Sequence, residues 1–265
     1  MGSAAINAPR QKKAWLSMRE TVIAVIPVYN HAEAIGTVVS AVLAQGFPCL
    51  LVDDGSEPGC AAVLDALALR HGPRVRLVRL VRNHGKGGAM MVGLREALRL
   101  GYQHALQIDA DGQHDTADLP HFVELARRHP EAVICGCPVY DDSVPRSRFY
   151  ARYATHIWVW INTLSLAIRD SMCGFRVYPL APVVALIDEV RLGRRMDFDS
   201  EVLVRLHWRG VPIVNRPTRV TYPLDGVSHF RLWMDNVLIS RMHALLFLGM
   251  LWRSPMLLWR KLGVS

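Results

Sequence analysis

The chain is 265 residues long, and its composition is 51% hydrophobic and 20% charged. This composition excludes a disordered chain, and the length allows one large α/β domain with appendages or two small domains. The formal net charge of +8 and the pI near 9.6 favour an anionic partner, namely a nucleotide, a membrane surface or a nucleic acid.

The cysteine pattern favours free thiols. The chain has five cysteines, an odd count, and none of them forms a C-x-x-C pair. Residues 1–20 are polar and basic and lack the apolar core of a secretory signal. We therefore expect reduced thiols in a reducing compartment. Cys135 and Cys137 allow a metal interpretation, but small buried residues at a strand end explain them better.

Strands and helices are predicted to alternate along the chain. The apolar run 21–26, stopped by Pro27, predicts a strand that is buried on both faces. We expect helices over 31–45, 57–70 and 86–100, and further strands over 48–52, 75–81, 105–108 and 132–135. This alternation predicts a mostly parallel, Rossmann-like sheet with helices on both sides.

Polar clusters fall at the predicted strand ends, over 27–30, 53–56, 82–87 and 109–111. In such sheets ligands bind beyond the carboxyl ends of the strands, so we expect these clusters to form one site. Asp109 and Asp111 are two residues apart and would point the same way at a strand end. A hard divalent cation such as Mg²⁺ or Mn²⁺ would relieve their repulsion and leave positions for phosphate oxygens. The alternative is a solvated Asp-Gly turn.

Two later segments are unusually apolar. Residues 149–168 are rich in aromatic and aliphatic side chains, and 230–262 contains the apolar run 245–252 with basic residues around it. Neither segment reaches the roughly 18 uncharged apolar residues that are needed to cross a bilayer. Both suit helices that lie in a membrane interface. For 230–262 we favour the membrane over packing against the sheet, and for 149–168 both alternatives stay open.

Five short motifs extend the pattern over residues 22–222. They are P-V-Y-N at 27–30 followed by Glu33, V-D-D-G-S at 52–56, R-N-H-G-K-G at 82–87, D-A-D-G-Q at 109–113 and C-G-F-R at 173–176. Together they resemble glycosyltransferase family 2, most closely its dolichol-phosphate mannosyltransferase-like (polyprenyl-phosphate glycosyltransferase) branch. One departure is that His31 and Ala32 separate Asn30 from Glu33.

The resemblance implies a fold of the glycosyltransferase-A type, a nucleoside-diphosphate sugar donor and a divalent metal. At the matching positions, the residues near the nucleotide sugar would be Pro27, Tyr29, Glu33, Asp53, Asp54, Lys86 and Asp109. Asp111 and Gln113 would hold the metal, and Asp109 would face the donor's ribose or the metal. G-K-G lacks the full phosphate-loop pattern, which argues against an ATPase. The alternative for Lys86 is a lysine at a helix start without a role in binding.

A second acidic segment, 195–201, is predicted to face the acceptor. Asp197, Asp199 and Ser200 are good N-cap residues, and we expect one of them to cap the helix that follows. The alternative is that Asp197 or Asp199 lies at the acceptor side of the sugar as a catalytic residue, and the resemblance favours Asp199. An ionised lipid phosphate needs only cations, whereas an alcohol acceptor needs a base such as Asp199. Candidate ligands of an acceptor phosphate are Arg176 (also a catalytic candidate), Arg216, Arg219, Ser228 and His229.

We therefore expect an inverting, metal-dependent glycosyltransferase with a lipid-linked acceptor, favouring polyprenyl phosphate. Residues 21–229 would form the catalytic domain, after a basic segment over 1–20 and before amphipathic membrane-associating helices over 230–265. We expect a peripheral location on the cytoplasmic face of the inner (plasma) membrane. We expect no nucleic-acid partner, since no recognised motif supports one. The alternatives are transfer to the hydroxyl of a lipid or other acceptor, or a catalytically silent nucleotide- or lipid-binding module.

Overall fold

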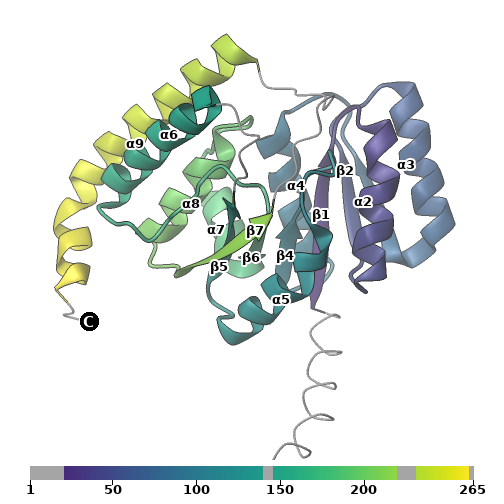
Figure 1. The fold of residues 1–265 in the computed structure, drawn as a ribbon, viewed down its shortest axis with the longest axis horizontal. Helices are drawn as coiled ribbons and strands as arrows, with labels where there is room; N and C mark the ends of the chain where they lie inside the picture. Colours follow the sequence, from purple (N-terminus) through teal and green to yellow (C-terminus); the bar gives the residue numbers. More distant parts are fainter. Residues whose placement is uncertain (1–20, 140–145, 220–230, 263–265) are drawn as a thin grey trace, which may run out of the picture.

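Seven strands form one mixed sheet, with helices on both faces (Figure 1). The structure, a computed structural model, describes residues 21–139, 146–219 and 231–262. The strands are β1 (Val22–Val28), β2 (Cys49–Asp53), β3 (Val75–Arg79), β4 (His104–Gln107), β5 (Val133–Val139), β6 (Arg176–Pro179) and β7 (Ile213–Arg219). The α-helices are α2 (Ala32–Ala44), α3 (Pro58–His71), α4 (Lys86–Arg99), α5 (Leu119–Arg128), α6 (Arg146–Thr163), α7 (Leu180–Glu189), α8 (Phe198–Trp208) and α9 (Leu232–Lys261), with 3-10 turns η1 (Gly72–Arg74) and η2 (Thr116–Asp118).

The strand order is β3-β2-β1-β4-β6-β5-β7. Strands β1 to β4 pair in parallel, and so do β5 and β7, whereas β6 is antiparallel to both of its neighbours. The prediction of a mostly parallel sheet is thus confirmed, with one antiparallel strand that the sequence pattern did not predict. Because β1 to β4 are parallel, the loops after them meet at one edge of the sheet.

The first strand continues through Pro27, so the expectation that Pro27 ends it was wrong. Pro27 pairs in register with Val52 of β2, and the pairing of β1 with β4 ends two residues earlier, at Val25. Proline has no N–H to donate, and it is tolerated here because no β4 residue lies opposite it. The other predicted helices and strands occur, with ends that differ by a few residues.

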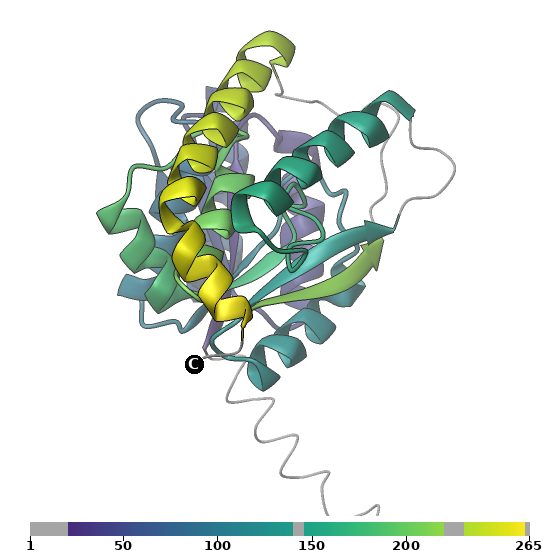
Figure 2. The same ribbon diagram turned by 90° about the vertical axis from the view of Figure 1, so that its left-hand side faces the viewer.

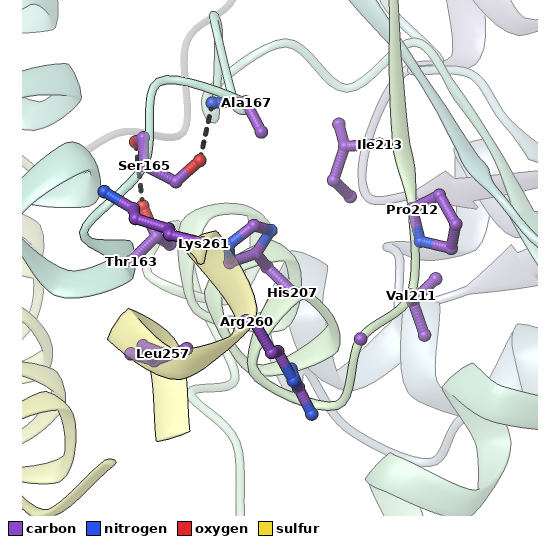
Figure 3. Close-up of a pocket in the computed structure, with 11 residues that line it drawn as sticks. Thr163, Ser165, Ala167, His207, Val211, Pro212, Ile213, Leu257, Arg260 and Lys261 are labelled. Atoms are coloured by element: carbon purple, nitrogen blue, oxygen red, sulfur yellow. Dashed lines mark hydrogen bonds between the residues drawn. The ribbon is translucent and has the colours of Figure 1, made fainter. Parts of the chain in front are cut away.

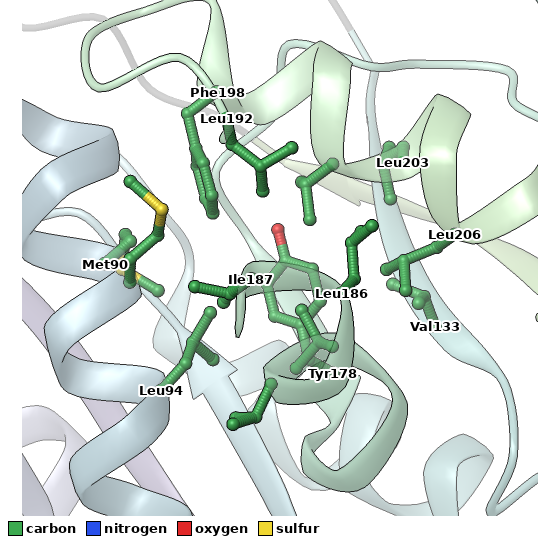
Figure 4. Packing of buried hydrophobic residues seen from close by; sticks show 14 of the residues in the cluster. Met90, Leu94, Val133, Tyr178, Leu186, Ile187, Leu192, Phe198, Leu203 and Leu206 are labelled. Carbon is green, nitrogen blue, oxygen red and sulfur yellow. The ribbon is translucent and has the colours of Figure 1, made fainter. Parts of the chain in front are cut away.

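Two hydrophobic cores lie on opposite faces of the sheet because alternate strand residues point in opposite directions. Ile23 and Val25 belong to the core that includes α4, α7 and α8, whereas Ala24 and Ile26 belong to the core that includes α2, α3 and α5. Figure 4 shows the first core, where side chains of α4, α7 and α8 meet over the ring of Tyr178.

Helices α6 and α9 form an outer layer beyond α8 and lie side by side (Figures 1 and 2). The C-terminal segment is a single helix rather than the several that we expected. Met242, Leu246 and Met250 of α9 belong to the first core, so one face of the helix is packed against the domain. Among the described residues, α9 alone is long and apolar enough to cross a membrane by length and composition, with 28% of its most apolar window buried.

Candidate active site

A lysine lies between two aspartates at the edge where the parallel strands end. Lys86 is the first residue of α4, and its Nζ is 2.9 Å from Asp109 Oδ1 and 3.0 Å from Asp199 Oδ2. Asp109 follows β4, and Asp199 lies in the first turn of α8. We call Lys86, Asp109 and Asp199 the lysine–aspartate cluster. The positive ends of the α4 and α8 dipoles add to the attraction for negative charge here.

The charges in this cluster stabilise one another. Burial by itself lowers the pKa of Lys86, but the carboxylates of Asp109 and Asp199 outweigh it and raise that pKa above its usual range. Burial likewise opposes ionisation of Asp109, but Lys86 and His114 hold the pKa of Asp109 well below its usual range. Near neutral pH the cluster therefore holds an ammonium group and the carboxylate of Asp109 in ionised form.

Buried polar groups hold Asp199 in place by hydrogen bonds. Gln107 Nε2 donates to Asp199 Oδ1 at 3.1 Å, and the Tyr178 hydroxyl donates to Gln107 Oε1 at 3.2 Å. Arg176 is fully buried, and it donates to the backbone oxygens of Asp199 and Ser171, each at 2.7 Å. This burial does not fit our expectation that Arg176 contacts an acceptor phosphate. In the structure Arg176 positions Asp199 instead.

The residues expected to hold a metal lie next to the cluster. Asp111 Oδ1 accepts a hydrogen bond from the backbone N–H of Gln113 at 3.0 Å. Burial, and then the charge of Asp109, raise the pKa of Asp111. His114 Nε2 is 3.5 Å from Asp109 Oδ2, and the His114 ring stacks on Phe175. Among the described residues no three His, Cys, Asp or Glu side chains converge as a metal-binding group.

This arrangement nevertheless fits a hard cation that brings some of its own ligands. A carboxylate whose ionised form is disfavoured by burial and by a neighbouring carboxylate gains from a nearby divalent cation. The carboxylate of Asp111 and the amide oxygen of Gln113 are ligands that Mg²⁺ and Mn²⁺ prefer, and phosphate oxygens and water commonly complete such sites. The metal role of Asp111 and Gln113 stays a prediction.

The loops after β1 and β2 are fastened together by side chains. Asn30, at a positive φ of 56°, accepts from the Glu57 N–H at 2.8 Å, and its own N–H donates to Ser56 Oγ at 3.1 Å. Fully buried Asp53 accepts from the Ser56 N–H at 2.9 Å and from Arg79 Nε at 2.7 Å. Asp53 therefore shapes this loop rather than offering a free carboxylate to a ligand.

The other residues expected near the nucleotide lie around these loops. Asp54 is buried, and its Oδ1 accepts from the His84 N–H at 2.7 Å. Burial raises the pKa of Asp54 despite this hydrogen bond. Pro27 and Tyr29 are half-buried, and Glu33 is exposed in the first turn of α2. The structure thus brings these residues to the same edge of the sheet as the cluster.

Two glycines permit the close packing around the cluster. A Cβ atom on Gly174 would lie 2.5 Å from Asp109 Oδ2, and one on Gly85 would lie 2.5 Å from the Arg194 carbonyl oxygen. Gly85 also has a φ of +83°, which side chains disfavour. Both glycines belong to motifs that the sequence analysis identified, and the structure shows that a larger residue would not fit at either position.

Several predicted acceptor residues are not part of the cluster. Arg216 and Arg219 lie on β7 at the far end of the sheet, and within the described residues neither pairs with the cluster. Ser228 and His229 fall outside the described residues. Asp197 occupies the N-cap position of α8 but makes no side-chain capping bond there, and its Oδ1 accepts from the Arg195 N–H at 3.0 Å.

The sequence analysis missed Gln107, Tyr178 and His114. A signal for Gln107 was present, because a polar residue interrupts the apolar run 105–108, and Gln107 is buried in the structure. Tyr178 gave no such signal, since its contact with Gln107 joins segments that are far apart in the chain. His114 lies only five residues after Asp109, but the local pattern did not show that its ring contacts that carboxylate.

A cavity of about 270 Å³ lies elsewhere, where α6, α8 and α9 end (Figure 3). Its lining includes His207, Arg260 and Lys261, and the last two are basic residues in the final turn of α9. Basic side chains offset the negative end of a helix dipole, so their presence here needs no bound ligand.

The fold and the site together define an α/β domain with an acidic site beyond the carboxyl ends of parallel strands. Residues 23–182 match the family described as glycosyl transferase family 2. The chain therefore belongs to this family, as its five motifs indicated, and it is a glycosyltransferase.

Curated relatives agree with the predicted branch. Dolichyl-phosphate beta-glucosyltransferase of Mus musculus is 28% identical over 254 residues, which cover 86% of this chain and 76% of that protein. Undecaprenyl-phosphate mannosyltransferase of Micrococcus luteus is 29% identical over 202 residues, which cover 74% of this chain and 82% of that protein. Polyprenol monophosphomannose synthase of Mycolicibacterium smegmatis is 29% identical over 174 residues, which cover 60% of this chain and 62% of that protein.

The fold resembles that of S. aureus TarS. The structure of TarS in complex with UDP-GlcNAc matches with a TM-score of 0.56 and 15% identity, over 85% of this chain and 66% of that chain. At this identity the likeness concerns the fold alone. It agrees with the predicted α/β fold of the glycosyltransferase-A type.

Proposed function

We propose that this glycosyltransferase moves a sugar from a nucleoside-diphosphate sugar to polyprenyl phosphate, with inversion at the sugar carbon. The observation that carries the proposal is the single ammonium group of Lys86 between Asp109, on the predicted donor side, and Asp199, on the predicted acceptor side. The names of three relatives, which mention dolichyl, undecaprenyl or polyprenol phosphate chemistry, support this acceptor class.

On the donor side, the diphosphate would lie beyond β1 and β4. Asp111 and Gln113 would hold Mg²⁺ or Mn²⁺, which when bound neutralises the charge that develops on the leaving diphosphate. Lys86 adds a positive charge that is already in place, so little reorganisation is needed as the sugar bond breaks. Pro27, Tyr29 and Asp54 would border the nucleoside, with Glu33 at its outer edge.

On the acceptor side, the polar contacts of Asp199 favour a phosphate over a hydroxyl. Asp199 Oδ1 accepts from Gln107, and Oδ2 is paired with Lys86. Both oxygens are therefore engaged by donors of the protein. A polyprenyl phosphate is already ionised near neutral pH and needs no base, whereas an alcohol needs a carboxylate to take its proton. In this proposal Asp199 positions Lys86, and attack by the phosphate in line with the leaving group inverts the sugar carbon.

We propose that the enzyme acts at the surface of a bilayer. Trp233, Trp252 and Trp259 of α9 are 84%, 85% and 52% exposed, and Trp158 of the neighbouring α6 is 44% exposed. Tryptophan beside basic residues is typical of helices at a lipid–water boundary. We propose peripheral attachment to the cytoplasmic leaflet of the inner membrane, where a nucleotide donor and a lipid phosphate can meet.

The test is transfer by the purified full-length protein. Nucleotide sugars are first screened with Mg²⁺ or Mn²⁺ for thermal stabilisation, where a donor at about 100 times its dissociation constant adds about 2.7 kcal/mol. The donor found is then offered with polyprenyl phosphate or with the matching polyprenol. We expect transfer to the phosphate alone.

The variant Asp199→Asn separates the two acceptor classes. It should nearly abolish transfer to a hydroxyl but reduce transfer to a phosphate far less, because no proton is taken from a phosphate. Transfer to polyprenol, abolished by Asp199→Asn, would overturn the phosphate assignment. If no donor released nucleoside diphosphate with any metal or extracted lipid, the chain would be a silent nucleotide- or lipid-binding module instead.

A further inference from the structure

An ion pair with a fully buried carboxylate joins the outer helix α9 to the segment that precedes α8. Asp235, in the first turn of α9, is fully buried, and its Oδ1 is 2.7 Å from Arg195 Nε. Its Oδ2 accepts from Arg195 Nη2 at 3.3 Å and from the Arg231 N–H at 2.7 Å. The Asp235 carboxylate pays a large desolvation cost at this depth, whereas the Arg195 side chain stays 23% exposed. An apolar contact would hold the two segments together at least as well. The pair therefore points to a need for one defined arrangement.

The segment that carries Arg195 also contacts both helix starts of the lysine–aspartate cluster. The Arg194 carbonyl oxygen accepts from the Gly88 N–H at 2.9 Å, two residues after Lys86. The Arg195 N–H donates to Asp197 Oδ1 at 3.0 Å, two residues before Asp199. A shift of Arg195 would thus displace residues at the first turn of α4 and at the first turn of α8.

The residues next to Asp235 face outward. Leu232 and Trp233 are 77% and 84% exposed, whereas Asp235 is fully buried. One turn of α9 therefore presents an apolar surface on one side and the ion pair on the other. A lipid surface that binds the exposed side of this turn shifts the population toward the arrangement of the turn that it contacts best.

We propose that Arg195 is a positioning residue that couples the seating of α9 on a lipid surface to the placement of Lys86 and Asp199. This inference rests on the proposed function, in which α9 lies on the bilayer that holds the acceptor. Transfer is then fast when α9 is seated and slow when it is not, so that the donor is not consumed away from the membrane.

The experiment compares wild type with Arg195→Gln, Asp235→Asn and the conservative Arg195→Lys. The acceptor is a short-chain polyprenyl phosphate, supplied in detergent or in vesicles with anionic phospholipid. We expect wild type to have a higher kcat on vesicles, by about tenfold, and Arg195→Gln to lose most of this ratio. Vesicle binding and donor binding should change less than twofold, and Arg195→Lys should restore part of the ratio. The matched control is Arg95→Gln, which breaks an exposed pair with Asp188.

A second measurement does not depend on turnover. Amide hydrogen exchange over 193–201 should slow when vesicles bind wild type and should stay unchanged when they bind Arg195→Gln. Equal vesicle-to-detergent ratios in wild type and Arg195→Gln, or slowed exchange in both, would overturn the coupling. If wild type transferred no sugar but vesicles still slowed exchange through Arg195, the proposed reaction would fail while the coupling stood.

Discussion

The lysine–aspartate cluster and the outer face of α9 depart from ordinary burial in opposite directions. The side chains of Lys86 and Asp199 are 18% and 6% exposed, whereas Trp252 is 85% exposed. Buried charge costs desolvation, and exposed apolar surface invites unwanted association. A domain that carries both costs has a use for both surfaces: one handles ionic groups, and we infer that the other contacts lipid.

The two regions also differ in how they are held. The cluster is fixed by polar contacts from β4, β6, α4 and α8, while α9 is held mainly by apolar packing against α6 and α8. Substitutions in the cluster should therefore affect chemistry, and substitutions on the outer face of α9 should affect location. The predictions below test this division.

The largest effect is expected from Asp111→Asn. We expect kcat/KM to fall by at least about 1,000-fold, because loss of a metal ligand removes roughly 4 kcal/mol of transition-state stabilisation. The measurement is transfer rate against Mn²⁺ concentration. Because the pKa of Asp111 is raised, metal affinity should begin to fall at a higher pH than for an ordinary aspartate as the solution is acidified. The control is Asp115→Asn, because Asp115 is an exposed acid on the same loop. This variant should keep the metal dependence of wild type.

Next is Lys86→Gln, which removes the ammonium group between half-buried Asp109 and buried Asp199. We expect transfer to fall by about 100-fold or more and the free energy of unfolding to fall by about 3 kcal/mol. Kinetics with saturating donor and denaturant unfolding measure the two effects. Arg99→Gln, on an exposed face of the same helix, is the control. A stable Lys86→Gln protein with wild-type kinetics would remove the cluster from the mechanism.

Asp170→Asn tests the ion pair between Asp170 and Arg152 of α6. Asp170 is buried and pairs with Arg152 at 2.7 Å. We expect a loss of about 3 kcal/mol at pH 7 by thermal or denaturant unfolding. Burial opposes ionisation of Asp170, but His156 and Arg152 hold its pKa below the usual range.

The pH dependence of Asp170→Asn has a definite sign. A depressed pKa stabilises the folded state above the unfolded pKa of about 4, and this stabilisation is lost as the pH falls through the folded value. The difference between wild type and variant should therefore shrink below about pH 4. A constant difference at all pH values would mean that packing, not charge, dominates. Asp188→Asn, in an exposed pair, should cost less than about 1 kcal/mol.

The smallest effect is expected from Trp252→Ser, on the outer face of α9. Vesicle affinity should fall by about tenfold, roughly 1.4 kcal/mol, with little change in stability or in kcat for a detergent-soluble acceptor. Sedimentation with vesicles measures the affinity. Leu69→Ser is the matched control, because Leu69 is 87% exposed on α3. Equal losses in both variants would mean that α9 holds no special membrane surface.

The alternation of apolar runs and polar strand ends was enough to predict the parallel half of the sheet. Its ligand edge followed as well, since side-chain direction and strand polarity are local properties. Strand β6 escaped prediction because its residues Arg176 to Pro179 begin with an arginine, which local pattern assigns to the surface. Only the tertiary structure shows that Arg176 donates to the backbone of Asp199.

The sequence by itself determined the family, the sheet edge that carries the site and the chemical type of its side chains. Motif spacing and hydrophobic period act within a few residues, and they carry that much information. The tertiary structure alone decided that Lys86 pairs with both Asp109 and Asp199, that Arg176 lies beneath the site, and that α9 is tied to the site through Arg195. These contacts join residues far apart in the chain, and only the packing of the whole domain sets their distances.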